Sequence, residues 1–507
     1  MSTAKKFAGQ TAIYGLSTII SRMIYFVLTP IYTRALPVGG NGIFTAMYGN
    51  ASIVNAILAF GMETTYFRYL QKRADNKQQV YNNAFGVVIA VSLVFLVFCL
   101  LFLDDIINYM QAGVVKDHAD YAFYVKNFLV ILVADAFCVI PFAKIRADGR
   151  PVKYAFVKCT NILFVVLFNL FFLFGVPFII KHHLPGAEWM AGWYRPHWVG
   201  YVFLANAAAS VFTIFLLLPE IFKLKMKFDG VMYKEMFLYS WPILIANISF
   251  IINESLDKVM LKHMLPEATS DRDVGIYGTC AKIAIFLSIF VQAFRLGAEP
   301  FFFSHAKNKN SGDTYARIMN YFVITVAVIT VAVVANVDLL AVVIVGKQTK
   351  MINHHLVPNI YWNGLGVVPL LLFGYLSLGI YMNLSVWYKL SDQTKYGLYI
   401  SGIGAVLTII LNWVFIPKYN YMASAWISFI AYATMMVLSY VWGQRNYPIP
   451  YNLKKNLIYI IISAVFVYLS FYVFNHNIFI GNALLMLFVI GTYFTEQKEL
   501  KAIFNKR

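Results

Sequence analysis

The sequence predicts an all-α integral membrane protein with about fourteen transmembrane helices. The chain of 507 residues is 60% hydrophobic and 17% aromatic, far outside the range of soluble globular domains. It contains apolar runs of about 20 residues, such as 84–103 and 457–474, which do not alternate polar with apolar residues as barrel strands would. Because backbone polar groups in lipid are satisfied only in helices or closed barrels, these runs predict helices.

The predicted spans follow one another along the chain, each bounded by a short polar or charged loop. They fall at 8–33, 42–67, 82–103, 121–143, 154–180, 198–219, 234–261, 274–303, 319–343, 359–389, 397–416, 421–443, 456–474 and 478–495. The first segment runs past Thr29 without the cleavage pattern of a signal peptide, so we interpret it as a retained helix. The longest outward loop, 181–198, is too short to fold as a separate catalytic domain.

The net charge of +18 is spread among short loops, which argues against nucleic acid as a partner. When alternate loops are assigned to opposite sides of the membrane, one set holds about three times as many Lys and Arg as the other. The basic set includes both ends of the chain and the loops at 68–80, 144–153 and 220–234. The positive-inside rule therefore predicts that both termini are cytoplasmic.

Metal and cofactor chemistry is not indicated. The four cysteines lie in predicted helices without paired spacing, and the adjacent histidines at 182–183 and 354–355 lie in outward loops, where such pairs are a poor metal signature. The sequence has no Gly-Lys phosphate loop, no dinucleotide-binding glycine pattern and no nucleophile elbow. We expect no cofactor, no metal site and no direct use of ATP.

A faint internal repeat relates the second span to the eighth. Gly42-Ile43-Phe44 resembles Gly275-Ile276-Tyr277, and Gly61-Met62-Glu63 resembles Gly297-Ala298-Glu299. The offset of about 235 residues corresponds to an even number of helices, so the two halves would be parallel repeats with a substrate path between them.

Lines of polar residues on one helical face distinguish the first, second, seventh and eighth spans, which we expect to surround a polar cavity. Each charge near the bilayer centre costs roughly 2.5–3.5 kcal/mol on insertion scales, so charged residues within spans are the strongest functional signal. The candidate substrate-binding residues are Arg22, Tyr25, Asn55, Lys126, Asn247, Lys258, Lys282, Gln292 and Arg295. The acids that could bind a coupling ion or serve the structure are Glu63, Asp135, Glu254, Asp257 and Glu299.

Structural roles stay open for several of these residues. Arg295 and Glu299 are four residues apart and could neutralise each other within one helix. Lysines near helix ends can extend to the membrane surface, which is an alternative for Lys258 and the expected behaviour of Lys158. Arg22 lies mid-span without a carboxylate on its own helix, and a guanidinium stays charged and binds phosphate bidentately, so it is the leading candidate for contact with an anionic ligand.

The motifs resemble those of bacterial polysaccharide flippases in the multidrug/oligosaccharidyl-lipid/polysaccharide exporter superfamily. The resemblance is carried by Leu28-Thr29-Pro30-Ile31-Tyr32-Thr33-Arg34-Ala35-Leu36, Gly42-Ile43-Phe44, Ser240-Trp241-Pro242, Leu256-Asp257-Lys258, Val274-Gly275-Ile276-Tyr277 and Ala281-Lys282-Ile283. Two positions depart from the family pattern: Pro37-Val38-Gly39-Gly40 stands where an acidic pair is frequent, and Lys258 replaces a common arginine.

The resemblance implies two six-helix lobes around a central cavity, at 1–226 and 227–443, followed by two further helices at 444–507. It also implies that a bacterial inner-membrane protein moves an undecaprenyl-pyrophosphate-linked oligosaccharide to the outer leaflet by alternating access. Expected partners are this substrate, membrane lipids and the polysaccharide polymerase and chain-length machinery. The membrane potential alone could assist, and Na⁺ or H⁺ coupling is a further possibility.

Two alternatives remain open. A drug or small-cation exporter of the same superfamily would use Glu63, Asp135 or Glu254 as cation and proton sites. A membrane glycan polymerase or ligase would need acid and base residues at an extracellular mouth and usually a large outer loop, which this chain lacks. We therefore expect a transporter and not an enzyme.

Overall fold

The structure, a computed structural model, describes residues 26–112, 118–225, 227–305, 311–352, 355–391 and 393–504. The chain divides into two compact units, 1–275 (unit 1) and 276–507 (unit 2), and each is described by itself. The lobe boundaries at 226/227 and 443/444 remain a prediction.

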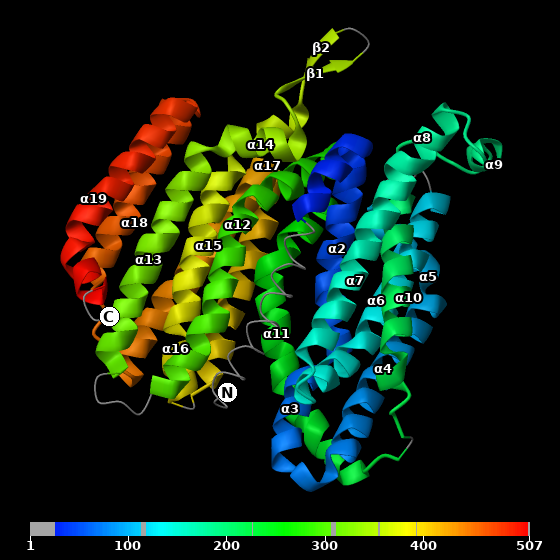
Figure 1. Cartoon of the computed structure of the whole chain (residues 1–507), viewed down its shortest axis with the longest axis horizontal. Helices are drawn as coiled ribbons and strands as arrows, with labels where there is room; N and C mark the ends of the chain where they lie inside the picture. The colour runs from blue at the N-terminus through cyan, green and yellow to red at the C-terminus, as the bar shows by residue number, and fades with distance from the viewer. Residues whose placement is uncertain are drawn as a thin grey trace. The chain divides into compact units, whose positions relative to one another are not determined.

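Unit 1 is a set of helices joined by short turns (Figure 1). A helix over 26–35 precedes the rest of the unit. The following helices are α2 Val38–Ala59, α3 Met62–Lys72, α4 Lys77–Leu101, α5 Leu103–Gln111, α6 His118–Ala147, α7 Pro151–Leu170, α8 Val176–Lys181, α9 Ala187–Ala191, α10 Gly200–Ile221 and α11 Gly230–Met264. A short 3-10 turn at Ala74–Asn76 leads into α4, and a π-helical turn at Phe171–Gly175 joins α7 to α8.

The second predicted span is broken where α2 meets α3. Phe60 and Gly61 both adopt the left-handed conformation, with φ of 48° and 65°. A side chain at Gly61 would also press on Ile243 of α11, so this position combines a positive φ with a close helix contact. Thr65 of α3 and Ser240 of α11 share a buried 2.6 Å hydrogen bond beside the break.

The two glycines that the internal repeat aligns pack against neighbouring backbone within unit 1. A Cβ at Gly42 of α2 would overlap the carbonyl oxygen of Asp271, and a Cβ at Gly275 would overlap the carbonyl oxygen of Val38. These backbones therefore approach at a distance that only glycine permits. Lys262 of α11 and Asp271 form a buried 2.5 Å ion pair close to this crossing.

The helix α12, Glu267–His305, begins in unit 1 and ends in unit 2. Unit 2 then adds further long helices (Figure 1). They are α13 Ser311–Ala335, α14 Val337–Val345, α15 Val367–Leu384, α16 Val386–Leu390, α17 Lys395–Asn446, α18 Leu453–Tyr468 and α19 Ile478–Phe504. A π-helical turn at Leu469–Val473 follows α18, and a 3-10 helix at Ile360–Gly364 precedes α15. Strands β1 Thr349–Ile352 and β2 His355–Pro358 form an antiparallel hairpin, with Thr349 opposite Pro358.

The predicted fold class is confirmed. Among the described residues, 12 helices are long and apolar enough to cross a membrane. One of them, Lys395–Asn446, changes direction at the non-helical Asn420 and accounts for both spans predicted at 397–416 and 421–443. Each predicted span from 42–67 onward thus has a counterpart, and most of the first span, 8–33, lies outside the described residues. The chain is a multi-pass membrane protein.

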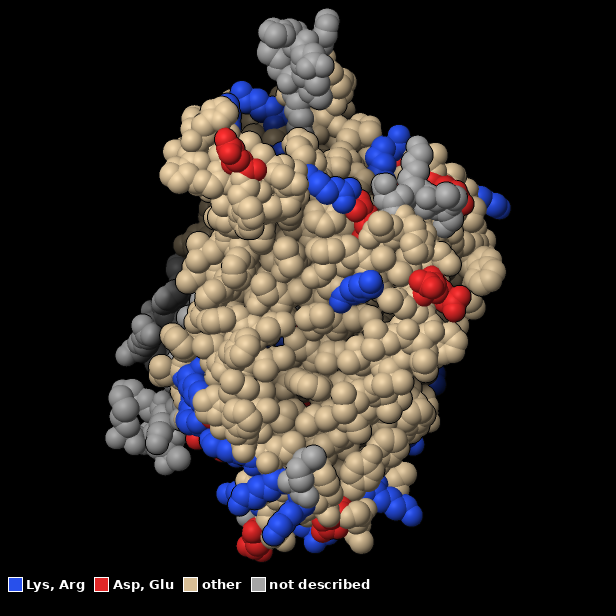
Figure 2. Space-filling model, turned by 90° about the vertical axis from the view of Figure 1, so that its right-hand side faces the viewer, with Lys and Arg blue, Asp and Glu red and all other residues tan. Residues whose placement is uncertain are grey.

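The surface agrees with a membrane environment. Figure 2, which shows the molecule from the side of α5 and α10, has a largely uncharged middle with charged side chains toward its two ends. Large apolar side chains stay exposed on the second half of α4 and along α18, including Val94, Leu101, Leu457 and Ile461. Apolar surface of this extent would be unfavourable in water and is expected of helices that contact lipid.

Candidate functional site

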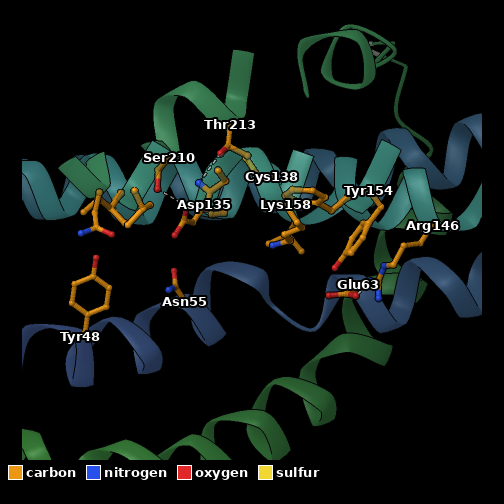
Figure 3. A pocket seen from close by; sticks show the side chains of 17 residues that line it. Tyr48, Asn55, Glu63, Asp135, Cys138, Arg146, Tyr154, Lys158, Ser210 and Thr213 are labelled. Carbon is orange, nitrogen blue, oxygen red and sulfur yellow. Dashed lines mark hydrogen bonds and ion pairs between the residues drawn. The ribbon is translucent and has the colours of Figure 1, made fainter. Parts of the chain in front are cut away.

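Unit 1 contains a polar cavity of about 370 Å³ between α2, α3, α6, α7 and α10. Its volume falls in the range of about 300–1,000 Å³ that is typical of small-molecule sites. The lining residues are Tyr48, Asn55, Glu63, Ile131, Asp135, Ala136, Cys138, Val139, Phe142, Arg146, Tyr154, Lys158, Asn161, Val165, Asn206, Ser210 and Thr213. Two carboxylates, two cations and several neutral polar groups therefore share one space between membrane helices (Figure 3).

Helical periodicity explains how the sequence builds this wall. The lining residues of α6 include Ile131, Asp135, Cys138, Phe142 and Arg146, those of α7 are Tyr154, Lys158, Asn161 and Val165, and those of α10 are Asn206, Ser210 and Thr213. Steps of three and four residues keep each set on one face of its helix. The three faces turn inward together because α10 packs against both α6 and α7.

Asp135 lies in the middle of this wall and is held in place by α10. Its Oδ1 accepts a 2.8 Å hydrogen bond from the Ser210 hydroxyl. One turn further along α10, Thr213 Oγ1 accepts a 2.8 Å hydrogen bond from Asn161 Nδ2 of α7. Asn55 extends from α2 toward the same wall (Figure 3). This centre offers a carboxylate and several amide and hydroxyl groups, which suit hydroxyl-rich ligands or a small cation.

Lys158 contributes a positive charge close to Asp135. Its ammonium group lies 4.3 Å from the centre of the Phe142 ring, a cation–π contact. The expectation that Lys158 extends to the membrane surface is wrong, because the side chain points into the cavity (Figure 3). Asp135 of the adjoining helix α6 lines the same cavity and gives the ammonium a favourable environment inside the unit.

Glu63 and Arg146 form an ion pair at one end of the cavity (Figure 3). Arg146 also lies over the rings of Phe67 and Tyr154, at 5.0 and 5.8 Å from their centres. Because Glu63 lies in the first turn of α3, directly after the α2–α3 break, the break determines where this carboxylate enters the cavity. Each of the two charges neutralises the other. Without the pair, α3 and α6 would each carry an uncompensated charge at the cavity.

A second ionic cluster joins the turn between α6 and α7 to the end of α10. The Glu220 carboxylate is 0% exposed and accepts 2.8 Å contacts from Arg150, Lys153 and Lys223. The hydrogen bond from Arg150 to Glu220 raises the pKa of that guanidinium above its ordinary value. Sequence reasoning missed Glu220, because only Lys223 is close to it in the sequence, whereas Arg150 and Lys153 come from the region where α6 meets α7.

Unit 2 contains a smaller pocket with a different character. Arg295 of α12, Asn383 of α15 and Lys389 of α16 line a space of about 10 Å³, together with apolar residues. The described lining of this pocket contains no carboxylate. Arg295 was a predicted substrate-binding residue, whereas Asn383 and Lys389 were not identified from the sequence.

The other predicted residues are distributed as follows. Asn55, Glu63 and Asp135 line the cavity of unit 1, and Asp257 pairs with its neighbour Lys258 at 2.7 Å. Lys126 on α6 and Asn247 and Glu254 on α11 are exposed, whereas Lys282 and Gln292 on α12 are half-buried. Arg22, Tyr25 and the side chain of Glu299 lie outside the described part of the chain. Within that part, no three His, Cys, Asp or Glu side chains come together as a metal site.

Two families of known proteins match the chain. The family described as "Polysaccharide biosynthesis protein" matches residues 7–298, and the MatE family matches residues 242–414. A curated relative, protein 1 of the Lsg locus of Haemophilus influenzae (strain ATCC 51907 / DSM 11121 / KW20 / Rd), is 21% identical over 306 residues. That match covers 59% of this chain and 66% of the relative, so the chain spans slightly less than two thirds of the relative's length.

Solved structures share the fold at low sequence identity. The lipid II flippase MurJ in an inward closed conformation has a TM-score of 0.71 and 13% identity, over 96% of this chain and 100% of the other. An inward-facing multidrug resistance MATE family transporter of the MOP superfamily has a TM-score of 0.63 and 11% identity, over 83% of this chain and 93% of the other. The first family matches more than half of the residues and confirms the predicted relationship. The chain therefore belongs to the polysaccharide biosynthesis protein family.

Proposed function

We propose that this protein is a flippase that translocates an undecaprenyl-pyrophosphate-linked oligosaccharide from the inner to the outer leaflet of the bacterial cytoplasmic membrane. Family membership supports the polysaccharide context. The observation that carries the proposal is the polar cavity of unit 1, which is surrounded by helices with apolar outer faces. A carrier of an amphiphilic lipid needs such a space for the polar part while the tail stays in the bilayer.

The chemistry of the cavity suits a glycan. Sugar hydroxyls both donate and accept hydrogen bonds, and the cavity offers Asp135 as an acceptor and Lys158 as a donor, with amides and hydroxyls between them. Glu63 and Arg146 largely cancel each other's charge, so the cavity does not select strongly for a charged ligand. Outward movement of about two negative charges across 100 mV, inside negative, is favoured by roughly 4–5 kcal/mol, so the membrane potential can assist the step.

Several finer features belong to the same proposal. Both termini would lie in the cytoplasm, as the distribution of Lys and Arg predicts. The halves of the chain would act as lobes that alternate in access. The product would be passed to the polymerase and chain-length machinery that builds a surface polysaccharide such as O-antigen or lipopolysaccharide, capsule or exopolysaccharide.

Reconstitution tests this function. Purified protein in liposomes that contain a fluorescent lipid-linked oligosaccharide should expose the glycan on the opposite leaflet, at a rate proportional to the amount of protein. Liposomes without the protein measure spontaneous movement. Equal rates in the two preparations would reject the proposal.

A second candidate is a cation-coupled exporter of small molecules. Asp135 favours it, because a carboxylate beside Ser210, Thr213 and Asn161 offers hard oxygen ligands to Na⁺ or a site for H⁺. The MatE match over residues 242–414 supports it independently. Efflux of a fluorescent organic cation driven by a Na⁺ or H⁺ gradient, without movement of lipid-linked oligosaccharide, would establish this candidate instead.

A further inference from the structure

The segment 222–234 of unit 1, which joins α10 to α11, alternates lysines with apolar residues. It begins Phe222-Lys223-Leu224-Lys225-Met226-Lys227-Phe228, and Lys234 follows in the first turns of α11. All four lysines are exposed. Phe222 is 79% exposed and Val231 is 72% exposed, so large apolar side chains emerge beside the charges. Basic residues next to exposed apolar groups are typical of surfaces that bind an anionic membrane.

The segment is held in a defined place against the start of α4, at the same end of unit 1 (Figure 1). Gln79 of α4 donates a 2.8 Å hydrogen bond to the carbonyl oxygen of Lys227. Asn83 of α4 donates to the carbonyl oxygen of Asp229 at 3.0 Å and accepts from its backbone nitrogen at 3.1 Å. These bonds engage the backbone of the segment while its lysine side chains stay exposed, so the charged surface is preformed.

The carboxylates close to the segment are engaged elsewhere. Asp229 caps α11, because its Oδ1 accepts hydrogen bonds at 3.0 and 3.1 Å from the first N–H groups of that helix. Glu220 is buried in the ionic cluster at the end of α10. Glu235 lies 3.5 Å from Lys72 and from Arg73. These acids therefore do not neutralise the rest of the segment.

The lysine surface consists of the three other lysines of the segment, Lys225, Lys227 and Lys234. No ion pair among the described residues includes any of them. In water, exposed lysines need no partner, because the solvent hydrates the ammonium group. Their position relative to the bilayer therefore decides whether they meet a ligand.

The length of α10 places the segment at the level of lipid headgroups. α10 is a candidate membrane span of 22 residues, Gly200–Ile221, which corresponds to about 33 Å and matches a hydrocarbon core of about 30 Å. Phe222 follows directly, where hydrocarbon gives way to headgroups. Lys225 and Lys227 come within the next five residues, so phosphate groups of the bilayer lie within their reach.

We propose that the segment 222–234 is a docking surface for anionic phospholipid headgroups, with Phe222 in the acyl region and the lysine surface against the phosphates. The proposal goes beyond the transported substrate and holds for a flippase or an exporter. An ammonium group attracts phosphate as a point charge without fixed geometry, which suits a fluid array of headgroups. An acidic protein segment would account for the lysines but not for an exposed Phe222 at the end of a membrane span.

Titration of the delipidated full-length protein in detergent with phosphatidylglycerol, followed by native mass spectrometry, tests this surface. Phosphatidylcholine with the same acyl chains is the zwitterionic reference. Each lysine near an anionic surface strengthens binding on the order of fivefold, so we expect phosphatidylglycerol to bind roughly tenfold or more tighter than phosphatidylcholine. The triple variant Lys225→Gln/Lys227→Gln/Lys234→Gln should lose most of this preference and bind phosphatidylcholine as the wild type does.

A matched triple variant removes the same number of charges elsewhere. Lys181→Gln/Lys347→Gln/Lys418→Gln replaces three exposed lysines outside the segment and should keep the wild-type preference. Phe222→Ser removes an apolar contact and no charge, so it should weaken binding of both lipids by a similar factor of roughly threefold or more. Thermal unfolding shows which variants are folded.

The salt dependence of the wild type tests the proposal without any substitution. A rise in ionic strength from about 0.1 to 1 M shortens the Debye length from about 10 to 3 Å and should remove most of the preference. Equal affinities of the wild type for the two lipids, a preference that salt does not change, or an unchanged preference in the folded lysine-surface variant overturns the proposal. Equal loss in the two triple variants also overturns it, because net charge alone would then set the preference.

Poly-glutamate tests an acidic protein as the occupant. It should bind the wild type more weakly than phosphatidylglycerol does, because it has no acyl chain to contact Phe222. Tighter binding of poly-glutamate, lost in the lysine-surface variant, would assign the surface to a protein partner and overturn the assignment to lipid.

Discussion

Asp135 Oδ1 accepts a 2.8 Å hydrogen bond from Ser210 Oγ, which joins α6 to α10 in the wall of the unit 1 cavity. The bond fixes one carboxylate oxygen and leaves the other available to the cavity. A carboxylate held in this way between membrane helices is costly unless it has a function or a compensating partner. Lys158 lines the same cavity and is a cation that could compensate it.

The first prediction concerns this carboxylate. Asp135→Asn keeps the size and one acceptor but removes the charge, so transport should fall by roughly tenfold or more while the protein stays folded. Ser210→Ala should have a smaller effect because only the orientation is lost. Transport rates in proteoliposomes provide the measurement. Glu188→Gln, which likewise replaces a carboxylate by an amide at an exposed position of α9, is the control. Wild-type transport by Asp135→Asn would remove Asp135 from the mechanism.

The second prediction concerns the ionic cluster around Glu220. Glu220→Gln would leave Arg150, Lys153 and Lys223 without their shared buried carboxylate. Because these cations are partly exposed, the free energy of unfolding should fall by about 1–3 kcal/mol, less than for a fully buried pair. Thermal unfolding in detergent would report the change.

Glu235→Gln is the matched control for Glu220→Gln. Glu235 is 35% exposed and lies 3.5 Å from Lys72 and from Arg73, so its loss should cost less than about 1 kcal/mol. Equal melting temperatures for Glu220→Gln and the wild type would show that the cluster does not stabilise the α6–α7 turn.

The third prediction concerns the glycine crossing in unit 1. Gly42→Ala would force its methyl group against the carbonyl oxygen of Asp271, and backbone cannot move aside as a flexible side chain can. We expect destabilisation of about 2 kcal/mol or more, seen as a lower melting temperature and lower yield. Gly402→Ala, where nothing lies within 4 Å, should be neutral or slightly stabilising. Similar melting temperatures for the two variants would contradict the close packing.

The fourth prediction concerns orientation. Single cysteines in the loops at 68–80 and 220–234 should be protected from a membrane-impermeant reagent in intact cells, and a cysteine in 181–198 should be labelled. The background should lack Cys159, which is exposed on α7. Labelling of the basic loops and protection of 181–198 would reverse the assigned topology.

Much of the fold could be predicted from the sequence, because spans are set by the length and hydropathy of contiguous segments. The change of direction at Asn420 separates two spans that the sequence had already divided at 416–421. The hairpin β1–β2 and the short helices α5 and α9 were predicted only as loops. Their segments are too short for periodicity to distinguish them from irregular turns.

The sites were predictable only in part. Asn55, Glu63 and Asp135 stand out as polar residues within apolar helices, and they do line one cavity. Lys158 was misinterpreted because distance from a helix end does not show which face meets a neighbour. Asn383 and Lys389 could not be found because the pocket that they line in unit 2 depends on the approach of α15 to α12 at Gly379, which is a tertiary contact.

The most direct test of the central claim, that the unit 1 cavity admits the glycan, is the flipping rate of a cavity-filling variant in proteoliposomes. Asn55→Trp places an indole in the cavity from α2, whereas Ile57→Trp places the same group on an exposed position of the same helix. We predict that the wild type and Ile57→Trp flip lipid-linked oligosaccharide at similar rates and that folded Asn55→Trp is slower by roughly tenfold or more. Flipping by Asn55→Trp at the wild-type rate would contradict the account.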